Sequence, residues 1–385
     1  MSALFAASPC LVGCSQLDQW LTDHAAHRTF RVRADWVVQG TQFVNMGFRK
    51  INRFTPIFYT HPEKGDLIIQ ANAIDGVAAY EKSSGREIWR KSIVNGVESS
   101  AKLVGDRLFV GANDGYFYCL SAKDGEVIWS FASHIENLAE PLIVEGLVIF
   151  LSGANTVYAL DEGTGKQVWL YARQDAQSLS VRGGSRPAYH DGSIFLGFSD
   201  GALVALVAKT GTVKWEKQLN RNKRFRDLDS NPLIDGEFLY VAGFDDRLYA
   251  LRTLTGDLVW KSERGGYGSP MIAKDRIFYA TTSETFDCLD RTNGQLIWSF
   301  PIKEGIATSS QIYKGLIVFG ESQGQLQFLD LETGKKVASF DPGRGLLSPP
   351  AVDEKSGHVF FISGEANVYS VSAVWDHFTL IPYLH

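Results

Sequence analysis

Short runs rich in aromatic and β-branched residues recur along the chain and are separated by tight polar turns. The clearest unit spans residues 231–260. Strands are predicted there at Asn231–Ile234, Glu237–Ala242, Arg247–Leu251 and Asp257–Trp260. Runs of this composition, joined by turns of two or three residues, are typical of hairpins, so the unit is predicted to be a four-stranded antiparallel sheet.

One feature of this unit repeats through the sequence. Seven times a turn that ends in glycine is followed four residues later by the same strand position, and six times that position is tryptophan. The column consists of Trp89, Trp129, Trp169, Trp215, Trp260, Trp298 and Ala338. A period of about 40 residues with several strands per unit predicts an all-β fold, the β-propeller. The tryptophans are expected to fill the wedges between neighbouring blades.

The number of blades follows from counting two kinds of turn. The hairpin between the second and third strands recurs eight times, near Asp75, Asp114, Asn155, Asp200, Asp245, Glu284, Gln323 and Ala366. Only seven fourth strands follow, but residues 33–38 offer an eighth, with Trp36 at the column position. We therefore predict eight blades of four antiparallel strands, with the N-terminal strand closing the ring. Seven blades is the alternative, if the weak first or last unit is not a blade.

Composition is consistent with this fold and excludes several functions. The 385 residues are 45% hydrophobic, which is enough to bury a large core. The net charge is −5, so the chain lacks the basic excess typical of proteins that bind nucleic acid. We divide the chain into a leader at 1–30 and a single propeller domain at 31–385. Cys119 and Cys288 occupy a slot that holds alanine in sister repeats, which predicts small buried residues rather than metal or redox chemistry.

The leader contains one candidate modification site. Leu11, Val12 and Gly13 precede Cys14, a sequence that resembles the lipobox of bacterial lipoproteins, in which the cysteine is lipidated. A signal peptide begins with a positively charged segment, but no Lys or Arg precedes Cys14 in this sequence. Lipidation of Cys14 is the prediction, and a plain disordered leader is the alternative.

Two connections between blades are longer than the others. They cover residues 171–187 and 219–232, and both join the fourth strand of one blade to the first strand of the next. They are therefore expected on one face, on adjacent blades, where loops carry function. Apolar residues expected to be exposed lie beside charges, which predicts a protein-binding patch. The apolar members are Leu179, Val181, Phe225 and Leu228, and the charged members are Arg182, Arg224, Arg226, Asp227 and Asp229.

These two segments carry a family resemblance. Residues 179–187 (LSVRGGSRP) and 226–232 (RDLDSNP) resemble, in order and spacing, two segments of the BamB family of outer-membrane assembly lipoproteins. The resemblance implies an eight-bladed periplasmic propeller that is anchored to the outer membrane by lipid and has no catalytic activity. It further implies a scaffold, without cofactor or metal, that binds the POTRA domains of BamA. Other components of the assembly machinery and unfolded outer-membrane proteins are further candidate partners. The positions that match the family's BamA-binding residues are Leu179, Val181, Arg182, Asp227 and Asp229.

Each of these residues also has a simpler interpretation. Asp227 and Asp229 could cap a turn, Arg182 could be a solvated loop residue, or the three could pair with one another and fix the shape of the loops. Two other functions also compete with the scaffold. One is a propeller that binds another periplasmic partner. The other is a pyrroloquinoline-quinone dehydrogenase. Enzymes of that family stack the cofactor against a disulfide between two adjacent cysteines, and no two cysteines are adjacent in this sequence.

Overall fold

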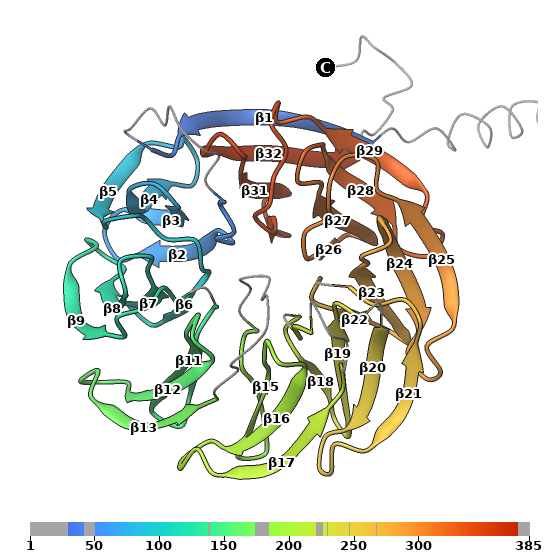
Figure 1. Cartoon of the computed structure of the whole chain (residues 1–385). Helices are drawn as coiled ribbons and strands as arrows, with labels where there is room; N and C mark the ends of the chain where they lie inside the picture. The colour runs from blue at the N-terminus through green and yellow to red at the C-terminus, as the bar shows by residue number, and fades with distance from the viewer. Residues whose placement is uncertain are drawn as a thin grey trace, which may run out of the picture.

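Eight four-stranded antiparallel sheets surround a central axis in the computed structural model of the chain (Figure 1). The structure describes residues 30–41, 51–137, 139–173, 185–220, 226–228, 230–245, 247–266 and 268–375. Every helix or strand assigned within these ranges is a β-strand. The same ranges contain no helix with the length and apolar character needed to cross a membrane. The prediction of an eight-bladed propeller is confirmed, and the seven-bladed alternative is wrong.

Blades 1 to 7 each consist of four consecutive strands that run outwards from the axis. Blade 1 contains β2 (Ile57–His61), β3 (Gly65–Asn72), β4 (Gly76–Glu81) and β5 (Glu87–Ser92). Blade 2 contains β6 (Ala101–Val104), β7 (Arg107–Gly111), β8 (Tyr116–Ser121) and β9 (Val127–Ala132). Blade 3 contains β10 (Leu142–Val144), β11 (Leu147–Leu151), β12 (Thr156–Asp161) and β13 (Gln167–Ala172). Blade 4 contains β14 (Ala188–His190), β15 (Ser193–Gly197), β16 (Ala202–Val207) and β17 (Val213–Gln218).

The remaining blades continue the series. Blade 5 contains β18 (Leu233–Asp235), β19 (Phe238–Gly243), β20 (Arg247–Arg252) and β21 (Leu258–Ser262). Blade 6 contains β22 (Met271–Ala273), β23 (Arg276–Ala280), β24 (Thr285–Asp290) and β25 (Leu296–Pro301). Blade 7 contains β26 (Gln311–Tyr313), β27 (Leu316–Gly320), β28 (Leu326–Asp330) and β29 (Lys336–Phe340). Blade 8 combines β30 (Ala351–Asp353), β31 (His358–Ile362) and β32 (Asn367–Trp375) with the N-terminal strand β1 (Phe30–Gln39).

Strand β1 closes the ring as the outermost strand of blade 8 (Figure 1). It pairs with β32 from Phe30 opposite Trp375 to Gln39 opposite Asn367. The pairing skips the residue before Trp36, and the fourth strands of the other seven blades skip a residue at the same point. The N-terminal strand therefore reproduces the bulge of the repeat, although it comes from the opposite end of the chain.

The repeated glycine and tryptophan act between blades. Gly125, in the turn between β8 and β9, has a φ of 78° and its backbone lies against the ring of Trp89 in the preceding blade, where a Cβ atom would come within 2.6 Å. The Trp89 indole then donates a hydrogen bond to the carbonyl of Ala122, 3.0 Å away, in the same turn. Because only glycine combines this conformation with this approach, each turn fits one tryptophan. The same contact joins Gly85 to Trp36, Gly165 to Trp129, Gly211 to Trp169, Gly256 to Trp215, Gly294 to Trp260 and Gly334 to Trp298.

Each tryptophan also needs a small residue opposite it on the third strand. Cys119 pairs with Trp129 and Cys288 with Trp298, whereas Ala79 pairs with Trp89. Both cysteines are fully buried free thiols, and burial raises the pKa of Cys119 to about 11 and that of Cys288 to about 12. The prediction that they are small packing residues is confirmed.

Blade 7 reverses this arrangement. Here Phe328 on β28 faces Ala338 on β29, so the large residue has moved to the third strand. The next blade offers no glycine turn to receive a tryptophan, because its fourth strand is β1. Phe30 of β1 packs on Phe328 instead, with ring centroids 5.4 Å apart. The missing tryptophan thus follows from the way in which the ring closes.

Polar contacts hold the chain where it leaves β1. The buried guanidinium of Arg90 donates to the carbonyl of Gly40 at 3.0 Å and to the carboxylate of Asp75 at 3.2 Å. The amide of Asn72 also donates to the Gly40 carbonyl, at 2.9 Å. A buried charge without such partners would be costly, so this network favours one path for the chain from blade 8 into blade 1.

We predict that the reversed pair in blade 7 behaves as one unit. Phe328→Ala alone should cost about 3–5 kcal/mol by leaving a cavity, and Ala338→Trp alone about 1–3 kcal/mol by overpacking. The double variant should be more stable than the sum of the single effects, because the two volumes compensate. Chemical denaturation in a double-mutant cycle measures this coupling. Phe328→Ala combined with the distant Phe150→Ala is the control and should be additive, and an additive result for Phe328 and Ala338 would contradict the prediction.

Candidate functional site

The two long connections leave the ring from blades 3 and 4. The structure describes where each begins and ends, namely Arg173, residues 185–187, residues 219–220 and residues 226–232 without Asp229. Leu179, Val181, Arg182 and Asp229 lie outside the described residues, as do Phe225, Arg224 and Cys14. The candidate docking site is therefore built from the roots of the two loops.

Both loops begin against one hairpin, the turn at Asp200 and Gly201 between β15 and β16. The guanidinium of Arg173 binds the Asp200 carboxylate and, at 2.7 Å, that of Glu216. These bonds raise the pKa of Arg173 although burial opposes its charge. On the other side, the backbone N–H groups of Leu219 and Asn220 donate to the Gly201 carbonyl at 3.0 and 3.2 Å. A partly buried, doubly paired arginine gives the first loop a fixed origin.

The loops also end against each other. The hydroxyl of Ser185 donates to the carbonyl of Ser230 at 3.2 Å, and the backbone N–H of Arg186 donates to the side-chain oxygen of Asn231 at 2.7 Å. The two connections are thus neighbours at both roots. The prediction that they leave one face from adjacent blades is confirmed for the part of the chain that the structure describes.

Leu228 does not belong to an exposed patch, and that prediction is wrong. Its side chain is fully buried between blades 4 and 5, and its N–H donates to the carbonyl of Phe198 at 3.2 Å. Gly197 and Gly243 make room for it, because a Cβ atom on either would come within 3 Å of Leu228. Leu346 packs on Gly320 in the same way. Leu228 and Leu346 each stand two residues before a serine, Ser230 or Ser348, that precedes the first strand of the next blade. Aligning that serine column would have identified Leu228 as a core residue.

Of the five positions that match the family's BamA-binding residues, Asp227 is the one that the structure describes. It is fully buried, and its carbonyl accepts a hydrogen bond from the N–H of Phe244 at 3.2 Å. A direct contact between its carboxylate and a partner would require this end of the loop to move. The placement favours the alternative role, in which Asp227 is a buried structural residue at the end of the loop.

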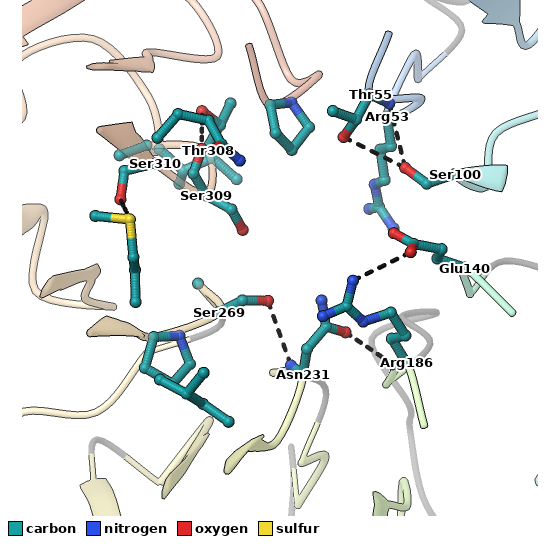
Figure 2. Close-up of a pocket in the computed structure, with 18 of the residues that line it drawn as sticks. Arg53, Thr55, Ser100, Glu140, Arg186, Asn231, Ser269, Thr308, Ser309 and Ser310 are labelled. Atoms are coloured by element: carbon teal, nitrogen blue, oxygen red, sulfur yellow. Dashed lines mark hydrogen bonds and ion pairs between the residues drawn. The ribbon is translucent and has the colours of Figure 1, made fainter. Parts of the chain in front are cut away.

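A cavity of about 890 Å³ lies on the propeller axis beside these roots (Figure 2). Every blade contributes one residue from just before its innermost strand. In seven blades this residue stands two positions before the strand, and in blade 2 it stands one position before. We call these residues the axial ring: Thr55, Ser100, Glu140, Arg186, Asn231, Ser269, Ser309 and Pro349. Proline follows the ring residue in six of the eight blades and holds it in an extended conformation. Sequence reasoning missed this site, although the proline column was a readable signal.

Hydrogen bonds connect neighbouring members of the axial ring. The N–H of Thr55 donates to the Ser100 hydroxyl at 3.2 Å, and the N–H of Asn231 donates to the Ser269 hydroxyl at 3.3 Å. Arg186 and Glu140 form an ion pair at 3.1 Å. Within the described residues, no group of three or more His, Cys, Asp or Glu side chains is placed to hold a metal ion.

Comparison with known proteins identifies the family. Residues 74–300 match a family model described as outer membrane protein assembly factor BamB. The outer membrane protein assembly factor BamB of Shewanella oneidensis is 28% identical over 325 residues, which cover 79% of this chain and 82% of that protein.

Solved structures agree in fold. The crystal structure of BamB from Moraxella catarrhalis superposes with a TM-score of 0.74 at 19% identity, covering 89% of this chain and 100% of that one. The quinohemoprotein alcohol dehydrogenase of Comamonas testosteroni superposes with a TM-score of 0.71 at 12% identity, over 88% of this chain and 76% of that one. At these identities the structural likeness shows a shared propeller fold.

We predict that Leu228 stabilises the fold. Leu228→Ala should lower the free energy of unfolding by about 2–5 kcal/mol, because a fully buried side chain is removed between two blades. Leu254, which is 83% exposed, provides the control, and Leu254→Ala should change stability by less than about 0.5 kcal/mol. Thermal and chemical denaturation measure both. Equal effects for the two variants would show that Leu228 is not a core residue.

Proposed function

The chain belongs to the BamB family of outer-membrane protein assembly factors, and from this premise we propose that it is a non-catalytic scaffold of the β-barrel assembly machinery. In this role it binds the POTRA domains of BamA and assists the folding and insertion of outer-membrane proteins. The observation that carries the proposal is the family match over residues 74–300, because that range includes both long connections.

The geometry supports docking through the two loops. Their roots are fixed by the Arg173 ion pairs at one end and by the bonds of Ser185 and Arg186 at the other. A loop with fixed roots loses less conformational entropy on binding than a free one, which favours affinity. In the proposal, Leu179 and Val181 form the apolar centre of the contact.

Charged residues supply orientation in this proposal. Arg182 and Asp229 contact the partner, whereas Asp227 supports the second loop from its buried position. Complementary charges at the edge of an interface set its orientation and the rate of encounter. The face that carries the loops is opposite to the face of the glycine turns, so docking leaves the packing of the blades undisturbed.

The proposed location is the periplasmic face of the outer membrane. The lipobox resemblance at residues 11–14 supports a lipid anchor on Cys14. In this proposal the lipid anchor on the leader and the partner surface on the ring are separate parts of the chain.

We predict that Arg182 and Asp229 contribute to docking. Replacing either with Ala should weaken binding to purified BamA POTRA domains by about 1–3 kcal/mol, the range for charged hydrogen bonds at interfaces. Isothermal titration calorimetry measures the loss, and circular dichroism checks the fold. Arg252 and Glu237, an exposed ion pair on the opposite face, give a matched double-alanine control that should bind normally.

Two results would separate the errors in this proposal. If the parent protein binds POTRA domains and the Arg182/Asp229 double variant binds equally well, the surface is wrong. If the parent protein does not bind POTRA domains at all, the partner is wrong, and the propeller serves another periplasmic protein. Absorbance of the purified protein in the quinone region, together with turnover of an alcohol, would instead support a dehydrogenase.

Cys14 is predicted to carry lipid when the full precursor is expressed in a Gram-negative host. Mass spectrometry of the membrane fraction should find an acylated N-terminal cysteine, and Cys14→Ser should release the protein into the soluble periplasm. Cys10→Ser is the matched control and should leave the protein in the membrane fraction. An unmodified chain that starts at Met1 in the soluble fraction would contradict the prediction.

A further inference from the structure

The axial cavity is chemically divided. Figure 2 shows Arg53, Glu140 and Arg186 on one side, contributed by blades 1, 3 and 4. The other side, from blades 6 to 8, combines apolar and uncharged polar residues. The apolar ones include Pro270, Met271, Ile306, Leu347 and Pro349, and the polar ones include Ser269, Thr308, Ser309 and Ser310. A ligand that fills the cavity therefore meets charge at one end and an uncharged, partly apolar wall at the other.

The charged side contributes two guanidinium groups and one carboxylate, and the other carboxylate in the lining, Asp235 of blade 5, is already paired with Arg291. The Nη1 atom of Arg186 pairs with Glu140 at 3.1 Å, while the side chain of Arg186 remains 43% exposed. In Figure 2 the side chain of Arg53 extends toward the same carboxylate from the opposite direction. Arg53 and Arg186 therefore approach the same part of the cavity wall, beside Glu140. A planar guanidinium has five N–H donors and suits a second carboxylate.

The apolar side is accessible to a ligand. Ile306 is 42% exposed, and Met271 also lines the cavity, where its sulfur accepts a long contact from the Ser310 hydroxyl at 3.9 Å. Methionine adapts to irregular apolar shapes, and burial of such surface favours binding. The hydroxyl of Ser309 on this side can accept or donate hydrogen bonds, whereas the hydroxyls of Ser100 and Ser269 already accept from backbone N–H groups.

From this arrangement we propose that the axial cavity binds an apolar carboxylate. The carboxylate contacts Arg186 and Arg53, and the apolar group lies against Met271 and Ile306. Both a small organic acid and the C-terminus of a peptide with an apolar last residue have this chemistry. Arg186 also belongs to the root of the first loop, but there it acts through its backbone N–H, and the proposal uses none of the residues proposed to contact POTRA domains. The acid titrations contain no POTRA domain, so failure of this proposal and failure of the proposed function are distinguishable.

The direct test is titration of the full chain with N-acetyl-leucine, followed by calorimetry or by protein NMR. N-acetyl-leucine amide, which lacks the charge, should bind at least about tenfold more weakly, as expected for the loss of a charged hydrogen bond. Acetate, which lacks the apolar group, should also bind more weakly. The tripeptide N-acetyl-Gly-Gly-Leu distinguishes the sources, because tighter binding of the tripeptide indicates a peptide terminus and equal binding indicates a small acid.

Two variants with opposite expected effects exclude a purely structural explanation. Arg186→Gln should weaken binding of N-acetyl-leucine about tenfold or more, because it removes the donor. Glu140→Gln should strengthen binding several-fold, because the competing carboxylate is removed while its hydrogen-bonding shape remains. Arg252→Gln, at a similarly exposed and ion-paired arginine on the opposite face, is the control and should leave binding of N-acetyl-leucine unchanged.

The proposal is overturned by any of three results. These are equal binding of the acid and its amide, weaker binding in both Arg186→Gln and Glu140→Gln, or the absence of binding by the folded parent protein up to millimolar acid. Thermal denaturation of each variant shows whether the fold is intact, and Arg186→Lys, which keeps the charge, should retain part of the affinity if Arg186→Gln proves unstable.

Discussion

The packing of one tryptophan on the glycine turn of the next blade is the contact on which the rest of this structure depends. A single four-stranded blade exposes two faces and cannot bury both alone, so its stability comes from its neighbours. The indole fills the wedge between blades, and the glycine lets the turn approach the ring closely. Because the contact is directional, each blade is rotated by a similar amount from the last, and seven such contacts, with a different one at the eighth junction, return the chain to its start.

Closure imposes a second constraint, because the last blade must be completed by the first strand. At that junction the repeat cannot supply a glycine turn, and the wedge is filled by Phe30 and Phe328 while the column position shrinks to Ala338. The buried network of Arg90 and Asp75 then directs the chain into blade 1. In a closed ring no blade is first or last, so each blade packs against a neighbour on both of its faces.

Function is left to parts of the chain that the packing does not use. The long connections of blades 3 and 4 are the places where the repeat permits extra residues, and their roots meet because adjacent blades bring them together. The axial cavity arises for a related reason. Eight innermost strands cannot converge on one line, so the residues that precede them surround a space that no side chain of the core fills.

The sequence by itself determined the propeller, the eight blades and the role of the N-terminal strand, because a periodic contact leaves a periodic trace in the residues that make it. It also identified Cys119 and Cys288 as packing residues, since the same slot holds alanine in four other repeats. The sequence did not separate buried from exposed positions within the loops, where the period is lost. Leu228 and Asp227 are enclosed by Gly197 and Phe244, residues distant in sequence, and the axial cavity joins side chains from all eight blades. Such proximity exists only once the ring has closed, so only the tertiary structure could decide it.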